Sequence, residues 1–139
     1  RLTEENKNGE YLSYKEISTL LGYKNLEIAS HGMSHTPILE SGHAALEAKE
    51  SKRAIVDNLA INPRCFVYPY GKFTVEAHRE IKKEFDFVFR IGGAANIGWG
   101  KEMLYRFSAD NVENPEGMFG VYKKINYGLK LALNMVRGL

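Results

Sequence analysis

The chain has 139 residues, which is enough for one domain with its own hydrophobic core but not for two. Its 44% hydrophobic and 26% charged residues are typical of a globular protein. A net charge of +2 with no basic run argues against nucleic acid as a partner. The lone cysteine, Cys65, excludes an internal disulfide and a multi-cysteine metal site. No apolar stretch reaches the ~20 residues that span a bilayer.

The N-terminal region opens on Arg1 rather than on methionine. We therefore expect residues 1–139 to be a single, incomplete domain whose upstream portion is missing. A first helix is predicted to begin after Ser13, because this residue is a plausible N-cap with Glu16 three positions further on. Gly22 follows as a stop signal for that helix.

A short strand and the clearest helix come next. Residues 26–30 are apolar and β-compatible, and they run directly into His31. A helix is predicted over residues 44–60, where apolar side chains recur on one stripe. We expect Glu47 to face solvent on this helix and His43 to be a polar cap residue at its start.

The second half of the chain continues the alternation of strands and helices. Strands are predicted at 65–68, 85–91 and 104–109, and helices at 74–84 and in an amphipathic tail from about residue 115. In that tail, four apolar residues share one side, namely Ile125, Leu129, Leu133 and Val136. This order predicts an α/β fold with a parallel sheet. Three or four strands are too few to close a barrel alone.

The segment S-H-G-M-S-H places His31 and His35 four positions apart, just after the first strand. On a helical turn, residues i and i+4 lie on one face, so both imidazoles could bind one divalent ion. The alternative is a pair of unrelated surface or capping histidines. Two ligands are also too few, because a catalytic zinc usually takes three protein ligands and a water.

A second candidate site is the segment Y-P-Y-G at residues 68–71. Pro69 restricts φ and Gly71 permits a conformation closed to other residues, so the turn is expected to be stiff. Such a turn can present the backbone N–H of Tyr70 to a ligand, as an oxyanion hole requires. The alternative is an ordinary strand-ending turn with two packing tyrosines.

Together, these motifs resemble the polysaccharide deacetylase family, also known as the NodB-like or carbohydrate esterase family 4 domain. The resemblance rests on the order strand, H-G-x-x-H, E-x-x-x-S-K helix, strand, Y-P-Y-G. The matching runs are LEIASHGMSHTPILE, EAKESKRAIVDNL and RCFVYPYGKFT. They span about residues 12–74, and a looser match continues through FDFVFRIGGAANIG and LYRFS.

The resemblance implies a fold, a cofactor and a reaction. The fold is a distorted (β/α) barrel, of which this chain would be part, with its site at the carboxyl ends of the strands. His31 and His35 would bind a divalent metal, usually zinc, together with an aspartate, and Tyr70 would offer its backbone N–H to the oxyanion. The reaction would be hydrolysis of N-acetyl groups from amino sugars of a polysaccharide, with release of acetate. Such substrates imply the cell envelope or exterior.

The sequence departs from the family pattern in its aspartates. Family members carry an Asp-Asp pair on the first strand, one as general base and one as metal ligand. Here Asp57, Asp86 and Asp110 all follow His35 and none is adjacent to another. We expect the pair to lie upstream. The alternatives are a degenerate deacetylase domain that binds glycan or acts as a scaffold, and an unrelated α/β binding module.

Three further residues bear on the resemblance. Val67 stands where many members have an arginine, two positions before the motif proline. The late Leu-x-His that supplies a general acid has no match, and His78 is expected on the surface of a helix. Arg106 is a candidate for supporting the site, with a surface or salt-bridge role as the alternative. Trp99 could stack on a sugar ring or fill a gap in the core.

Overall fold

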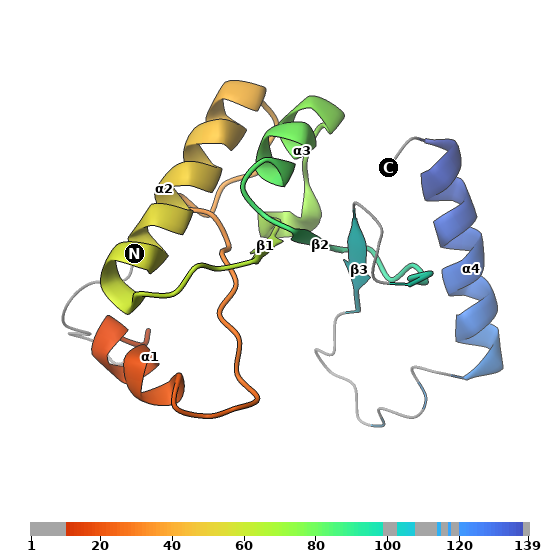
Figure 1. Ribbon diagram of the computed structural model, residues 1–139. Helices are drawn as coiled ribbons and strands as arrows, with labels where there is room; N and C mark the ends of the chain where they lie inside the picture. Colours follow the sequence, from red (N-terminus) through yellow and green to blue (C-terminus); the bar gives the residue numbers. More distant parts are fainter. Residues whose placement is uncertain (1–10, 99–102, 108–113, 115–116, 118–119, 138–139) are drawn as a thin grey trace.

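A small parallel sheet lies at the centre of the structure, with helices on either side of it (Figure 1). This computed structural model describes residues 11–98, 103–107, 114, 117 and 120–137. The elements in chain order are α1 (Tyr14–Leu20), α2 (Ser41–Leu59), β1 (Cys65–Val67), α3 (Val75–Lys82), β2 (Phe87–Ile91), β3 (Leu104–Arg106) and α4 (Val121–Val136). Trp99 and the end of the predicted strand at 104–109 lie outside the described residues.

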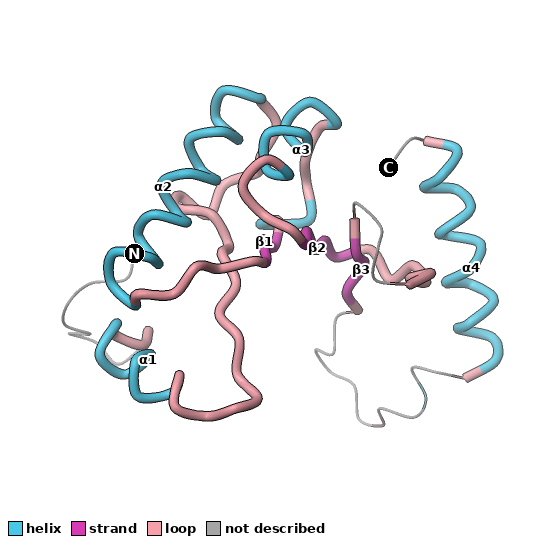
Figure 2. The backbone as a smooth tube through the Cα atoms, in the orientation of Figure 1, coloured by secondary structure: helices cyan, strands magenta, loops and turns pink. Residues whose placement is uncertain are grey.

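The sheet confirms the predicted parallel α/β arrangement. Its strand order is β1-β2-β3, with Phe66 opposite Val88 and Phe89 opposite Leu104. The strand predicted over residues 26–30 does not form, because only Ser30 comes into register with β1. Ser30 forms a single parallel bridge to Phe66, and the preceding residues are drawn as loop in Figure 2.

The main core lies between the sheet and the pair α2 and α3, which pack side by side (Figure 1). Phe66 and Val88 come from neighbouring strands, and Ile81 comes from α3; all three are fully buried. Burial of apolar surface of this kind is the main stabilising term in folding. The complete cluster is Ile38, Ala44, Ala48, Phe66, Tyr68, Ala77, Ile81, Phe85, Val88 and Met103.

Local sequence signals account for the helix ends. The capping box predicted at the start of α1 is confirmed, because the Ser13 N–H donates to Glu16 Oε2 at 2.7 Å and Ser13 Oγ accepts from the Glu16 N–H at 3.3 Å. The long helix begins three residues earlier than predicted and ends at Leu59, followed by Ala60 as C-cap with a left-handed φ of 54°. Thr74 caps α3 by accepting from the Ala77 N–H.

Three predictions for polar side chains are wrong. Glu47 is only 6% exposed, because its face of α2 turns toward the loop at residues 31–35, which we call the histidine loop. His43 is not a cap but lies inside the first turn of α2, where Nε2 is 3.5 Å from Glu47 Oε1. His78 is 8% exposed rather than on the surface, and its Nδ1 lies 3.0 Å from the Tyr68 hydroxyl.

Helix α4 lies at the far side of β3 from the main core (Figure 1). It is attached through a small second cluster formed by Ala94, Tyr105 and Leu131. The amphipathic pattern predicted for the tail is present, but the apolar stripe faces solvent rather than the sheet. In the described part of the chain, we find no helix long and apolar enough to cross a membrane.

We predict that Phe66→Ala destabilises the protein by about 3–5 kcal/mol, because it removes a fully buried aromatic ring from the main core. Urea unfolding monitored by circular dichroism measures this change. Leu46→Ala on the exposed side of α2 is the matched control, with an expected change below about 0.5 kcal/mol. Equal effects of the two variants would contradict the placement of the core.

Candidate functional site

The two sequence motifs meet at the carboxyl edge of the sheet. His31 directly follows Ser30, which pairs beside β1, and the turn at residues 68–71 directly follows β1 itself. Because parallel strands all present their carboxyl ends at the same edge, loops leaving neighbouring strands come together there. The sheet therefore brings the histidine pair and the Y-P-Y-G turn into contact.

The imidazole of His31 is oriented by the backbone of β1. Its Nδ1 lies 2.7 Å from the carbonyl oxygen of Val67. A carbonyl only accepts, so Nδ1 carries the proton and donates it, which leaves the Nε2 lone pair of the neutral ring available. Partial burial lowers the pKa of His31, and the nearby charges of His35 and Arg106 lower it further, against the opposing effect of the Val67 carbonyl.

A loop, rather than the predicted helical turn, brings the two histidines together. Gly32 and His35 both have left-handed backbone conformations, with φ of 81° and 53°. The ring centroids of His31 and His35 lie 4.9 Å apart in an edge-on arrangement. A left-handed conformation at a residue other than glycine is uncommon and marks a tightly held site.

The turn after β1 is held in a sharply bent conformation. Tyr70 and Gly71 have φ values of 56° and 64°, and an added Cβ at Gly71 would lie 3.1 Å from the Ile91 carbonyl oxygen. Within the residues that the structure describes, the Tyr70 N–H makes no hydrogen bond. The Tyr70 ring faces His35, with centroids 5.1 Å apart and the hydroxyl 3.4 Å from His35 Nδ1.

The carboxylate of Glu47 accepts hydrogen bonds from the backbone of the histidine loop. Glu47 Oε2 accepts the N–H of Met33 at 2.6 Å and the N–H of Ser34 at 3.1 Å. An added Cβ at Gly32 would lie 2.7 Å from the same oxygen, so only glycine allows this approach. Burial raises the pKa of Glu47, but the hydrogen bonds from Ser34 and Met33 and the nearby His43 outweigh it and hold the pKa below its usual value.

A second buried contact joins the same helix to the strand edge. Ser30 Oγ donates to Ser51 Oγ at 2.7 Å, and both residues are buried. The Gly32 N–H in turn donates to Ser30 Oγ at 3.2 Å. Helix α2 therefore fixes both ends of the short segment that carries His31.

Arg106 lies at the end of β3, on the same edge of the sheet. Its charge acts on His31, and its Nε is buried without a hydrogen-bond partner among the described residues. The backbone carbonyl of Arg106 accepts from the N–H groups of Gly92 and Gly93. The described part of the chain holds no group of three or more His, Cys, Asp or Glu side chains suited to a metal ion.

A groove of about 580 Å³ runs beside the histidine loop, between α1 and α2. Its walls are mainly apolar, with Ile17 from α1, Ile55 from α2 and Ile28 from the segment before the loop. His31 and His35 also line it. The groove therefore extends along residues 28–30, between α1 and α2, and reaches the two imidazoles.

Sequence reasoning missed Glu47, although a signal for it existed. Glu47, Ser51 and Ile55 follow one another at intervals of four, and the first two continue the apolar stripe of α2. A carboxylate and a hydroxyl on a buried stripe need partners inside the protein, so their position already indicated a polar contact with another segment.

We predict that Glu47→Gln destabilises the protein by about 1–3 kcal/mol, because the amide cannot accept from both backbone N–H groups while satisfying its own donors. Urea unfolding measures the stability, and hydrogen exchange measures the opening of the Met33 and Ser34 amides. The exposed Glu50→Gln on the same helix is the control. Unchanged exchange at both amides in Glu47→Gln would contradict the role of this carboxylate.

Comparisons with known proteins place these features in context. The sequence profile of the family described as "Polysaccharide deacetylase" matches residues 4–88. The structure resembles a de-N-acetylase of Aggregatibacter actinomycetemcomitans, with a TM-score of 0.63 and 17% identity over 70% of this chain and 48% of that one. It also resembles a polysaccharide deacetylase of Bacillus cereus, with a TM-score of 0.63 and 18% identity over 76% and 34% of the two chains.

A third similar structure is a Streptococcus pyogenes deacetylase in complex with acetate. Its TM-score is 0.69 and its identity 17%, over 81% of this chain and 51% of that one. The chain thus spans between about a third and about a half of the length of these structures. At such identities the likeness shows the fold, which is part of the (β/α) barrel of these enzymes. No match was found among curated proteins.

Proposed function

The chain belongs to the polysaccharide deacetylase family, and from that premise we propose that the protein is a metal-dependent hydrolase of N-acetylated amino sugars in a polysaccharide. The reaction would release acetate. The observation that carries the proposal is the contact between two motifs: two imidazoles 4.9 Å apart, of which His31 is oriented by Val67, lie beside a turn whose Tyr70 N–H makes no hydrogen bond among the described residues. The proposed substrate places the protein in the cell envelope or outside the cell.

His31 and His35 are the proposed ligands of a divalent metal, with Zn²⁺ favoured by the imidazole donors. Two features support this fit: the Nε2 lone pair of His31 is available, and partial burial lowers the pKa of His31, which favours the neutral ring that a metal ligand requires. When bound, zinc polarises a carbonyl group and lowers the pKa of a water to about 7. We propose that the third ligand and the general base are aspartates upstream of Arg1, on a segment that would lie in the groove beside residues 28–30.

The turn after β1 is the proposed oxyanion site. Tyr70 would donate its backbone N–H to the oxyanion, while Pro69 and Gly71 hold the backbone in the conformation that presents it. Arg106 would support the site because its positive charge disfavours protonation of His31. Its buried Nε makes no hydrogen bond among the described residues and could donate to a carboxylate. We propose no general acid among the described residues, since His78, the histidine that follows the turn, is buried with its Nδ1 3.0 Å from the Tyr68 hydroxyl.

We predict that zinc binds to the purified protein and that His31→Ala and His35→Ala each weaken this binding by at least about 100-fold. Loss of a residue that only hydrogen-bonds a metal ligand already lowers metal affinity about 10- to 100-fold, so loss of a ligand itself should cost more. Isothermal titration calorimetry measures the affinity. Acetate release from N-acetylglucosamine oligomers should fall by about 10³-fold in the same variants, since Lewis-acid activation is worth several kcal/mol. Glu50→Gln serves as the control for both readouts.

Two outcomes would contradict this proposal in different ways. Acetate release that persists in His31→Ala would exclude the histidine pair as the catalytic metal site. Zinc binding without any acetate release would favour the second candidate, a glycan-binding domain without catalysis. That candidate is supported by one observation, the lack of a third metal ligand among the described residues.

We further predict that Tyr70→Phe retains acetate release within about threefold, whereas Gly71→Ala lowers kcat by about 100-fold or more. The phenylalanine keeps the backbone N–H and loses only the hydroxyl near His35. The alanine is strained at a φ of 64° and meets the Ile91 carbonyl, so the turn must move. Loss of activity in Tyr70→Phe with full activity in Gly71→Ala would assign the role to the side chain instead.

A further inference from the structure

The apolar stripe of α4 faces solvent along the whole length of the helix. Five side chains that recur every three or four positions form it, and we call them the α4 stripe: Tyr122, Ile125, Leu129, Leu133 and Val136. Each is more than half exposed, from 54% at Leu133 to 87% at Val136. A continuous apolar stripe of this kind marks a binding surface rather than a scatter of surface residues.

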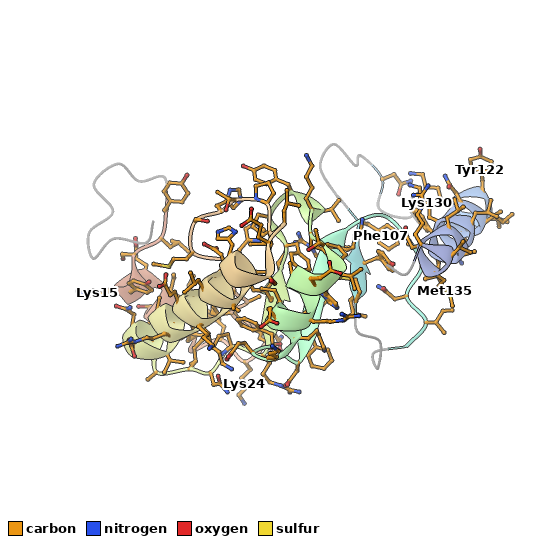
Figure 3. All side chains as sticks on the ribbon, turned by 90° about the horizontal axis from the view of Figure 1, so that it is seen from above. Lys15, Lys24, Phe107, Tyr122, Lys130 and Met135 are labelled. Carbon is orange, nitrogen blue, oxygen red and sulfur yellow. The ribbon has the colours of Figure 1, made fainter. Side chains whose placement is uncertain are left out.

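The α4 stripe is not the side by which the helix attaches to the rest of the molecule. Attachment runs through Leu131, which is 7% exposed, and through the ring of Tyr127, which lies 4.4 Å from that of Phe107. At 100° per residue, Leu131 points about 200° away from Leu129, the middle of the stripe. Figure 3 shows α4 at one end of the molecule, with Tyr122 at the outer side of the helix and Phe107 on the side that faces the rest of the chain.

The charges on α4 point to an anionic partner. Four basic side chains lie on the helix and at its end, at Lys123, Lys124, Lys130 and Arg137, and no acidic residue occurs from 121 to 139. The rest of the chain carries 15 basic and 17 acidic residues, so the positive charge of the protein is concentrated here. The basic residues flank the α4 stripe: Lys123, Lys130 and Arg137 lie on one side of its middle and Lys124 on the other, each about a quarter of a turn or more away.

From this juxtaposition we propose that α4 is an interfacial helix that lies on an anionic lipid surface, with the α4 stripe in the acyl boundary and the basic residues at the headgroups. A second copy of the helix fits less well, because facing stripes would bring lysines together with no carboxylate between them. The helix is also too short and too charged to cross a bilayer. It would lie in the membrane surface.

The test is flotation with lipid vesicles, using the whole protein and a matched pair of variants. Wild type should bind vesicles of equal parts phosphatidylglycerol and phosphatidylcholine, and should bind pure phosphatidylcholine much more weakly. The double variant Ile125→Glu with Leu129→Glu should lower the partition coefficient at least about tenfold, since both side chains leave the acyl boundary. Leu46→Glu, equally exposed on α2, should bind as wild type does. Raised salt should weaken the binding of wild type.

Three results would overturn the proposal. The first is failure of wild type to float with the anionic vesicles, and the second is flotation of the double variant equal to that of wild type. The third is a wild-type dimer, measured by analytical ultracentrifugation, that the double variant abolishes and that does not bind vesicles. Circular dichroism of each variant verifies that the helix content is kept, which is expected because both substituted positions are exposed.

Discussion

The hydrogen bond from His31 to the Val67 carbonyl is the interaction on which the candidate site depends. Val67 is the last residue of β1, and the turn that carries Tyr70 begins right after it. The same short strand therefore orients the imidazole and positions the backbone N–H. Because the carbonyl can only accept, this one contact also decides which nitrogen of His31 is left for a metal.

Helix α2 supplies the second constraint. Glu47 binds the backbone of the histidine loop, and Ser51 binds the residue before it, so the loop is held at both ends by buried polar contacts. Hydrogen bonds in a low-dielectric environment resist distortion, and leaving any of these groups unpaired would be costly. This arrangement accounts for left-handed backbone at both Gly32 and His35.

Local signals predicted most of the elements and the two motifs. Apolar periodicity marked α2 and α4, the capping box marked α1, and the proline and glycine of the 68–71 turn marked the end of β1. The burial of Glu47 and His78 was not predicted, because their partners lie on segments more than nine residues away. The contact between the two motifs joins segments that are far apart in the sequence, so local signals did not predict it. The outward orientation of the α4 stripe likewise depends on how the helix packs against distant segments. The family profile ends at residue 88, before β3 and α4.

The most direct test of the proposed site is the tautomer of His31, read by long-range ¹H–¹⁵N NMR at pH 7.5. We expect a neutral ring with the proton on Nδ1, and a shift of the Nε2 resonance when zinc is added, with His35 shifting in parallel. A proton on Nε2, or a His31 ring that is unaffected by zinc, would contradict the proposed role of β1 in preparing a metal ligand.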